Sequence, residues 1–284
     1  MTVSLPQLAI LGAGSMGGAI LSGLLSPDVE VAGITVTNRT ESKAAALRRS
    51  TAGHPGVVSL ALESDPDATA TALRGARLVL LGVKPAMVPD VLRGIRDLLE
   101  PDALVVSVAA GVTIGTMEAL VPQVVFRAMP NTPSVVGLGV TGVAAGERAS
   151  ADDAALVRTL FETVGAVIEV PESQIDALST ISGSGPAYVF YLIEQLTATA
   201  RNLGFDEQQA RLMVEQTFRG ASELLARERA QSDAGPAELR RRVTSPKGTT
   251  ERAVGVLESA DLTGLFDRAA AAALLRAAEM ARGE

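Results

Sequence analysis

Three glycines near the amino terminus have the spacing of a phosphate-binding turn. Gly12, Gly14 and Gly17 follow an apolar run at residues 8–11, and an Ala/Leu-rich helical run begins at once. In such a turn the first glycine allows a tight bend, the second lets a pyrophosphate approach the backbone, and the third lets helix and strand pack closely. The free N–H groups of the helix then face the phosphates. We therefore predict a dinucleotide site, the alternative being a glycine-rich turn that binds nothing.

The residues after the next predicted strand bear on the kind of dinucleotide. A site for NAD usually has an Asp or Glu there, which holds the ribose 2′-hydroxyl. This chain has Asn38, Arg39 and Thr40 instead. Asn38 and Thr40 can donate hydrogen bonds, and the planar guanidinium of Arg39 can pair with a 2′-phosphate. The segment favours NADPH, with NADH as the second candidate; an ordinary polar loop is the alternative.

Two stretches in the second half of the chain are more polar and richer in glycine than ordinary helix linkers. They cover residues 182–188 and 243–250. The second stretch ends where a helix is predicted to start, so it offers free N–H groups and hydroxyls that suit a small carboxylate. Two capped helices would explain the same residues without a site.

Composition excludes several other kinds of chemistry. The 284 residues include no cysteine and one histidine, His54, which lies in a Gly/Pro-rich loop. Disulfides and thiolate chemistry are therefore absent, a metal site is not expected, and we expect His54 to be a surface residue. The formal charge of −7 and the lack of a basic stripe with interleaved aromatics give no support for nucleic-acid binding.

Neither a signal peptide nor a membrane span is expected. No charged segment precedes the apolar run that starts at Leu8, and no apolar run reaches about eighteen residues. We expect a cytoplasmic protein that has no membrane partner.

The elements that position these residues alternate between strand and helix as far as residue 170. The predicted strands cover residues 8–11, 33–37, 57–60, 76–83, 103–109, 123–128, 141–145 and 166–170. The predicted helices cover residues 15–25, 41–50, 65–73, 87–99 and 151–164. This alternation, with continuous apolar strands, predicts a parallel, doubly wound sheet that is buried on both faces. Ligands bind beyond the carboxyl ends of such strands, and the glycine turn and the loops at 38–39, 84–85, 109–111 and 129–133 all fall there.

After Val170 the strand signals stop. Helices are predicted at residues 185–204, 206–229, 236–243, 249–259 and 262–282. The fold class is therefore α/β, an N-terminal Rossmann-type doubly wound sheet followed by an all-helical domain, with domains at 1–165 and 166–284. The helix faces are Ala-rich and weakly charged, which favours their burial against a second copy, so we expect a homo-oligomer.

Five motifs follow one another along the chain, at residues 12–17, 83–85, 129–133, 182–188 and 243–250. In these motifs, and over essentially its whole length, the sequence resembles the pyrroline-5-carboxylate reductase family. The resemblance implies a Rossmann domain followed by a helical dimerisation domain that swaps helices between subunits, with dimers often assembled into decamers. It also implies the last step of proline biosynthesis, in which a hydride passes from NAD(P)H to the C=N carbon of L-1-pyrroline-5-carboxylate and gives L-proline.

The resemblance carries site residues over by position. The residues implied to bind the cofactor are Leu11, Gly12, Ala13, Gly14, Ser15, Met16, Asn38, Arg39, Val83, Lys84, Pro85, Val108, Ala109, Ala110 and Asn131. The residues implied to bind the substrate are Glu172, Ser245, Gly248, Thr249 and Thr250. Asn131 would lie close to the nicotinamide end, and Thr250, as the catalytic residue, would hydrogen-bond the ring nitrogen. A protonated cyclic imine is already a strong electrophile, so positioning can do most of the work and the lack of a catalytic His, Cys or metal is no obstacle.

The chain departs from the family pattern at two places. Lys247 stands where the family usually has a glycine. It could add a cation beside the substrate carboxylate, or point to solvent from a backbone geometry that glycine makes easier, and we favour the second. An Asn that commonly follows the third strand is absent from residues 65–70, which weakens the expected adenosine contacts.

Two other functions are weighed against this one. A reductase of the β-hydroxyacid dehydrogenase type has the same layout, but it uses a catalytic lysine on a helix of the second domain, whereas Lys247 is the only lysine after Asp176. A non-catalytic NADP-binding protein would bind the cofactor without turnover.

Overall fold

The computed structural model describes residues 2–282. The chain divides into two compact units: the first comprises residues up to Gly183 together with the chain from Ala273 onward, and the second is Ser184–Ala272. The boundary predicted near residue 165 stays a prediction, because compactness within one chain does not define where a folding unit ends.

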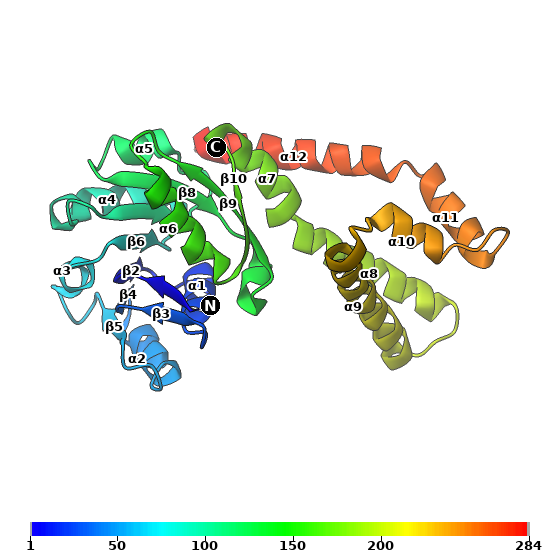
Figure 1. Cartoon of the computed structure of the whole chain (residues 1–284), viewed down its shortest axis with the longest axis horizontal. Coiled ribbons are helices and arrows are strands. Elements are labelled where there is room, and N and C mark those ends of the chain that lie inside the picture. Colours follow the sequence, from blue (N-terminus) through cyan, green and yellow to red (C-terminus); the bar gives the residue numbers. More distant parts are fainter. Residues whose placement is uncertain (1, 283–284) are drawn as a thin grey trace. The chain divides into compact units, whose positions relative to one another are not determined.

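Within the described residues, an eight-stranded sheet forms the centre of the first unit (Figure 1). In chain order its strands are β2 (Leu8–Leu11), β4 (Ile34–Asn38), β5 (Val57–Ala61), β6 (Leu78–Leu81), β7 (Leu104–Ser107), β8 (Val124–Met129), β9 (Gly139–Ala145) and β10 (Gly165–Glu169). The spatial order is β10-β9-β8-β7-β6-β2-β4-β5. This arrangement confirms the predicted doubly wound sheet. Two short parallel strands, β1 (Val3–Leu5) and β3 (Val29–Val31), form a separate pair that was not predicted.

One neighbouring pair in the large sheet is antiparallel, namely β8 and β9. Only residues 130–138 connect these two strands. A parallel crossover needs a dozen or more residues, so this connection is too short to return the chain to the starting edge. The remaining neighbours run parallel, as predicted.

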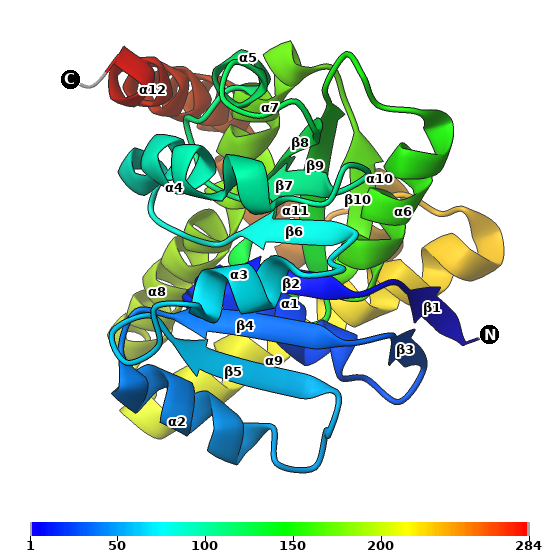
Figure 2. The same ribbon diagram turned by 90° about the vertical axis from the view of Figure 1, so that its left-hand side faces the viewer.

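Helices cover both faces of the sheet (Figures 1 and 2). They are α1 (Ser15–Leu24), α2 (Glu41–Ser50), α3 (Ala68–Leu73), α4 (Val88–Ile95), α5 (Ile114–Glu118), α6 (Ala151–Glu162) and α7 (Ile175–Leu178). Short 3₁₀ turns lie at η1 (Pro85–Met87), η2 (Arg96–Leu98), η3 (Thr132–Val136) and η4 (Glu172–Gln174), and η5 (Ser179–Gly183) is a π-helical turn.

Successive side chains of each central strand pack into two different hydrophobic cores, one on each face of the sheet. Ala9 and Leu11 pack on the face that α4 and α5 cover, whereas Leu8 and Ile10 pack on the face that α1 and α6 cover. Side chains of a strand alternate between faces, so a strand buried on both sides must be apolar throughout. This explains why the predicted strands are continuous apolar runs rather than alternating ones.

The strand order reverses at β2. From β2 the chain builds outward through β4 and β5 on one side and through β6 and β7 on the other. Figure 2 shows β6, β2, β4 and β5 lying side by side in that order. In such sheets the loops at the reversal point diverge to opposite faces, and a crevice opens at the carboxyl ends of the two strands. Here those strands are β2 and β6.

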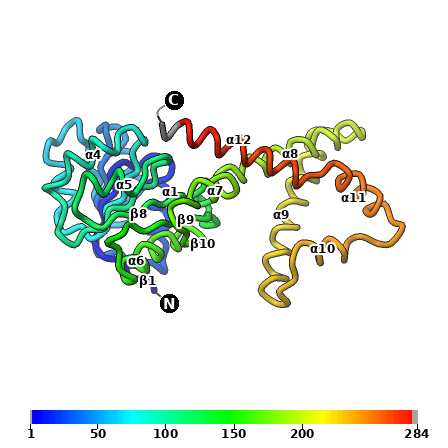
Figure 3. Tube along the Cα trace, turned by 90° about the horizontal axis from the view of Figure 1, so that it is seen from above, coloured from blue at the N-terminus to red at the C-terminus, as the bar shows by residue number. Residues whose placement is uncertain are grey.

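The second unit is helical. It contains α8 (Gly185–Asn202), α9 (Glu207–Ser232), α10 (Pro236–Arg242), α11 (Thr249–Ser259) and the first part of α12 (Leu262–Arg282), whose path Figure 3 traces. A capping box between Asp206 and Gln209 starts α9, next to the predicted start of this helix at residue 206.

The helices of the second unit leave large apolar side chains uncovered. Side chains at least 60% exposed are Phe190, Tyr191, Leu203, Leu212, Val243 and Val256. In the part of the chain that the structure describes, no helix is both long enough and apolar enough to cross a membrane.

Candidate functional site

Two glycines allow the carboxyl ends of β2 and β6 to meet. Gly12 has φ +95°, and a Cβ there would lie 3.1 Å from the carbonyl oxygen of Gly82. A Cβ on Gly82 would lie 2.2 Å from the carbonyl oxygen of Gly12. Both positions therefore need glycine for backbone packing alone. Gly82 was missed in the sequence, where the only signal is that it interrupts the apolar run at 76–83.

Gly14 and Gly17 differ in what surrounds them. A Cβ on Gly17 would lie 2.7 Å from the carbonyl oxygen of Gly12, so helix α1 can pack this closely only without a side chain. Gly14 is exposed, and the nearest atom to a Cβ there is the Gly82 carbonyl oxygen at 3.8 Å, an ordinary contact distance. Packing thus explains Gly17 but leaves Gly14 unexplained. A pyrophosphate that rests on the backbone would explain it.

The first turn of α1 has the electrostatics of an anion site. Gly14 is its N-cap, so no side chain accepts a hydrogen bond from the first amides, and the first turn contains no acidic residue. The positive end of the helix is therefore left uncompensated by the protein. The backbone N–H groups of Ser15 and Met16, in the first turn, can therefore donate hydrogen bonds to a phosphate.

Asn38 and Arg39, both predicted to contact the ribose, have different environments. Asn38 ends β4 and is 4% exposed, and its Nδ2 donates to Ser59 Oγ at 3.3 Å. Arg39 is exposed and has no ion-pair partner among residues 2–282. The structure thus leaves the Arg39 guanidinium available for a ligand, while it uses the Asn38 amide within the protein.

The predicted residues after β6 and β7 lie at the same edge of the sheet. Val83 is half-buried, and Lys84 and Pro85 are exposed at the start of η1. After β7, Val108 is half-buried, Ala109 is buried with its N–H donated to Ser107 Oγ, and Ala110 is exposed. These loops follow β6 and β7, the strands that continue the sheet from β2.

Asn131 joins three segments of the first unit. Its Nδ2 donates to the Ser182 carbonyl oxygen at 2.9 Å, and its Oδ1 accepts from the Val140 amide at 2.8 Å. Ser182 belongs to the π-helical turn η5, and the residue four positions on, Pro186, has no N–H to donate to its carbonyl. Asn131 supplies the missing donor. Every residue of the polar stretch 182–188 except Ser184 is helical, and α8 begins at Gly185 as predicted.

Arg127 on β8 is buried and forms ion pairs with two partly exposed carboxylates. Its Nη2 lies 2.6 Å from Asp176 Oδ1, and its Nη1 lies 3.5 Å from Glu172 Oε1. Among residues 2–282, its Nε has no hydrogen-bond partner. The same Glu172 oxygen accepts the Ile114 amide at 2.7 Å. The Glu172 carboxylate, predicted to lie near the substrate, is thus engaged within this unit. Arg127 was missed, although a lone charge in the apolar strand at 123–128 marks it.

The loop at 243–250 leads into α11 in the second unit. Gly248 is the N-cap of α11 and donates its N–H to the Ser245 carbonyl oxygen at 2.9 Å. Lys247 has φ +61°, is exposed, and donates its N–H to Glu251 Oε2 at 2.8 Å. This is the left-handed conformation that favours glycine, the residue usual in the family at this position.

The start of α11 offers donors to a small anion. The hydroxyl-bearing residues Ser245, Thr249 and Thr250 are exposed there, and the glycine N-cap accepts no hydrogen bond through a side chain. The amides of the first turn and these hydroxyls can together bind a carboxylate. The sequence-predicted substrate residues of this loop are therefore brought together within one turn.

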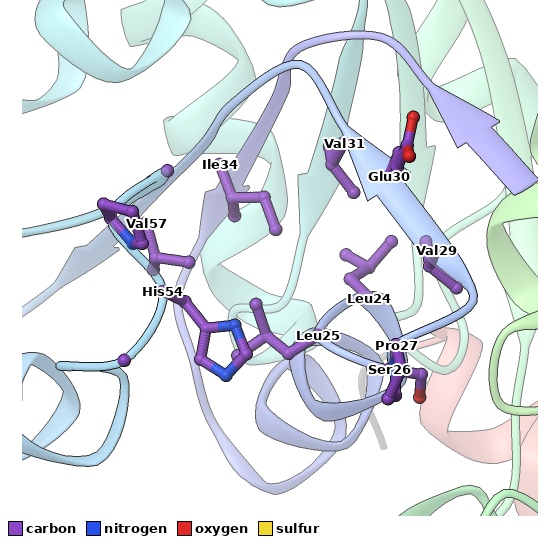
Figure 4. Close-up of a pocket in the computed structure, with 13 residues that line it drawn as sticks. Leu24, Leu25, Ser26, Pro27, Val29, Glu30, Val31, Ile34, His54 and Val57 are labelled. Atoms are coloured by element: carbon purple, nitrogen blue, oxygen red, sulfur yellow. The ribbon is translucent and has the colours of Figure 1, made fainter. Parts of the chain in front are cut away.

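A surface pocket of about 510 Å³ lies elsewhere in the first unit, between His54 and Leu25 (Figure 4). It borders the amino ends of β4 and β5, opposite to the edge where doubly wound sheets bind ligands. His54 is exposed, as expected. Within residues 2–282, no three His, Asp or Glu side chains are grouped so that they could hold a metal ion.

Comparisons with known proteins agree with this layout. A family model described as pyrroline-5-carboxylate reductase dimerisation matches residues 172–280, and one described as NADP oxidoreductase, coenzyme F420-dependent, matches residues 7–111. The pyrroline-5-carboxylate reductase of Corynebacterium melassecola is 36% identical over 97% of this chain and 98% of its own length. That of Pseudomonas aeruginosa is 36% identical over 98% of both chains.

Solved structures show the same fold. The structure of a pyrroline-5-carboxylate reductase from Coxiella burnetii superposes with a TM-score of 0.85 at 36% identity, covering 96% of this chain and 97% of that one. The Plasmodium falciparum pyrroline carboxylate reductase, crystallised with NADP bound, gives a TM-score of 0.77 at 24% identity, covering 97% and 98%.

Proposed function

The chain belongs to the pyrroline-5-carboxylate reductase family, and we propose that it reduces the C=N bond of L-1-pyrroline-5-carboxylate with NAD(P)H to give L-proline. The observation that carries this proposal is the 36% identity to reductases of this name over nearly the full length of both chains. The shared region includes both the glycine turn and the loop before α11. Lys247 lies in a loop and not on a helix, which speaks against the β-hydroxyacid dehydrogenase mechanism.

The cofactor is proposed to lie along the carboxyl edge of the sheet. The empty space at Gly14 and the uncapped start of α1 fit a pyrophosphate. When bound, the reduced nicotinamide supplies the hydride. The proposed contacts are Leu11, Gly12, Ala13, Gly14, Ser15, Met16, Asn38, Arg39, Val83, Lys84, Pro85, Val108, Ala109, Ala110 and Asn131. Because Arg39 suits a 2′-phosphate, NADPH is the proposed cofactor and NADH the second candidate.

The substrate carboxylate is proposed to bind at the start of α11. Ser245, Gly248 and Thr249 would hold it through hydroxyl and amide donors, and the Thr250 hydroxyl would hydrogen-bond the ring nitrogen. These contacts fix the imine carbon in place for hydride addition. Since the protonated imine is a strong electrophile, orientation is the main task left to the protein.

Glu172 is retained as a proposed substrate-proximal residue. Its carboxylate already accepts the Ile114 amide and pairs with Arg127. This environment favours a positioning role over direct contact with the substrate.

Self-association is proposed through the helical region that matches the dimerisation model, residues 172–280. The exposed apolar side chains of the second unit support a homodimer. A decamer is the larger assembly that the family resemblance implies, and a cytoplasmic location is proposed. Neither nucleic acid nor membrane is proposed as a partner.

The proposal is tested by following NADPH oxidation at its absorbance band with pyrroline-5-carboxylate, for wild type and Thr250→Ala. Thr159→Ala on α6 also removes one hydroxyl and one methyl group, but from a helix of the first unit, so it serves as the matched control. We expect rapid turnover in wild type and control and a large loss in Thr250→Ala. Rapid turnover in all three would remove Thr250 from its role. Bound NADPH without turnover in any of them would overturn the proposed reaction.

A further inference from the structure

An acidic side chain from another strand lies beside the end of β4, although residues 38–40 include no acid. In the parallel pair β4–β5, Asn38 is the register partner of Ala61, and Glu63 comes two residues after Ala61. Glu63 Oε1 accepts the backbone N–H of Glu41 at 2.6 Å. Glu41 is the first residue of α2, three positions after Asn38. The Glu63 carboxylate is therefore held at the segment predicted to meet the ribose.

The charged side chains near the end of β4 differ in whether they form ion pairs. Glu41 is paired with Arg48 and also accepts the Ser64 hydroxyl at 3.1 Å. In the part of the chain that the structure describes, neither Glu63 nor Arg39 has an ion-pair partner, and both are exposed. One exposed anion, which accepts the first amide of α2, and one exposed cation thus stand in the loops that follow the neighbouring strands β5 and β4.

Sites of this fold distinguish the two nicotinamide cofactors by charge. A carboxylate at the end of the second strand accepts a hydrogen bond from the 2′-hydroxyl of NADH and repels the 2′-phosphate of NADPH, whereas an arginine has the opposite preference. The carboxylate usually belongs to the strand itself. Here the fold supplies it from the loop after the adjacent strand.

We propose that Glu63 is a cofactor-specificity residue that favours NADH and opposes the preference of Arg39 for NADPH. This rests on the proposed function, in which the carboxyl edge of the sheet binds the dinucleotide. Because the two side chains act in opposite directions, the enzyme accepts both cofactors. Removal of either charge makes it selective.

The test measures binding of the adenosine half alone, so that it is independent of turnover. Calorimetric titration of the purified chain gives two affinities, one for adenosine 2′,5′-bisphosphate and one for 5′-AMP. The quantity compared is the affinity for the bisphosphate divided by the affinity for 5′-AMP. Glu63→Gln keeps the oxygen that accepts the Glu41 amide but removes the charge. Repulsion between a carboxylate and a nearby phosphate dianion at a solvated surface is worth about a tenfold change in affinity. We expect the ratio to rise about tenfold in Glu63→Gln and to fall in Arg39→Gln.

Glu30→Gln is the matched control, because it removes one exposed carboxylate from β3, which leads into the amino end of β4. Its ratio should equal that of wild type, and thermal melting should show all variants folded. A ratio in Glu63→Gln equal to that in Glu30→Gln overturns the inference. Wild type that binds both nucleotides but does not reduce pyrroline-5-carboxylate overturns the proposed reaction and leaves the inference standing. Wild type that reduces pyrroline-5-carboxylate but binds neither nucleotide overturns the inference and leaves the proposed reaction standing.

Discussion

The substitution Gly14→Ala adds one methyl group and should weaken cofactor binding without changing the stability of the fold. The backbone there has φ −72°, which alanine adopts without strain, and the nearest atom to the new Cβ is 3.8 Å away. As an N-cap, alanine lowers the free energy of unfolding relative to glycine by somewhat less than about 1 kcal/mol. The lower conformational entropy of its unfolded chain raises the same free energy by about 0.4–1 kcal/mol. Gly14→Ala should therefore change the free energy of unfolding by less than about 0.5 kcal/mol.

The same methyl group occupies the space where the pyrophosphate is proposed to rest. Forcing a methyl group into a filled contact costs about 1–3 kcal/mol, which corresponds to about 5- to 150-fold in a dissociation constant. Gly14→Ala should weaken NADPH binding by this factor. Calorimetric titration measures the binding, and urea unfolding of the same preparation measures the stability.

Gly17→Ala provides the comparison because it makes the same chemical change three residues away. Its Cβ would lie 2.7 Å from a backbone oxygen that cannot rotate away, so α1 must shift and we expect a loss of about 1–3 kcal/mol in unfolding free energy. The reasoning would be refuted if Gly14→Ala lost as much stability as Gly17→Ala while it bound NADPH like wild type. Gly14 would then be a packing residue, and the anion site at α1 would have no support.

Three further changes test other parts of the structure. Asp176→Asn leaves Arg127 buried with a longer contact to Glu172, and should lower the unfolding free energy in urea by about 2–3 kcal/mol, less than for a fully buried pair since Asp176 is 43% exposed. Lys247→Gly relieves a left-handed conformation and should raise the unfolding free energy by about 0.5–1 kcal/mol. Burial alone would raise the pKa of Asp153, but hydrogen bonds from Ser150 and Arg77 outweigh it and hold the pKa below its ordinary value of 3.8. The stability from Asp153 is therefore present above this value and lost as the pH falls from it through the lower pKa of the folded state, so wild type should lose more stability than Asp153→Asn as the pH falls below about 4.

Each of these outcomes has a clear contrary result. A stable Asp176→Asn would show that Glu172 alone compensates the buried guanidinium. A less stable Lys247→Gly would mean that the lysine side chain makes contacts that outweigh the backbone strain. Parallel loss of stability with pH in wild type and Asp153→Asn would remove Asp153 from the acid response.

The elements of the fold were predictable because each follows from local periodicity. Continuous apolar runs gave the buried strands, and helix α2 was predicted with the same ends that it has, Glu41–Ser50. The β1–β3 pair was not predicted, since it depends on how two separate segments of the chain meet. The antiparallel pairing of β9 with β8 was also not predicted, although the short connection at 130–138 carries that information.

The site was less predictable than the fold, for a related reason. Spacing along the chain identified the glycine turn, but it could not say which glycines the protein needs for its own packing. Gly82 and Glu63 reach the site from neighbouring strands and have no fixed spacing to it in the sequence. Residues 38–40 include no acid, and the fold brings the Glu63 carboxylate to this point from the loop after β5.

Two motifs of the chain, residues 129–133 and 182–188, are linked by a hydrogen bond from Asn131 to Ser182. Pro186 removes the amide that would satisfy the Ser182 carbonyl in an α-helix, and a buried carbonyl without a donor costs about 1–3 kcal/mol. Asn131 donates to that carbonyl, while its own oxygen accepts from Val140. The proline in one motif therefore requires the amide side chain in the other. Because Asn131 lies two residues after the end of β8, at the edge where the cofactor is proposed to bind, these hydrogen bonds fix the backbone there. Rigid placement of this kind is what hydride transfer to an already electrophilic imine demands of the protein.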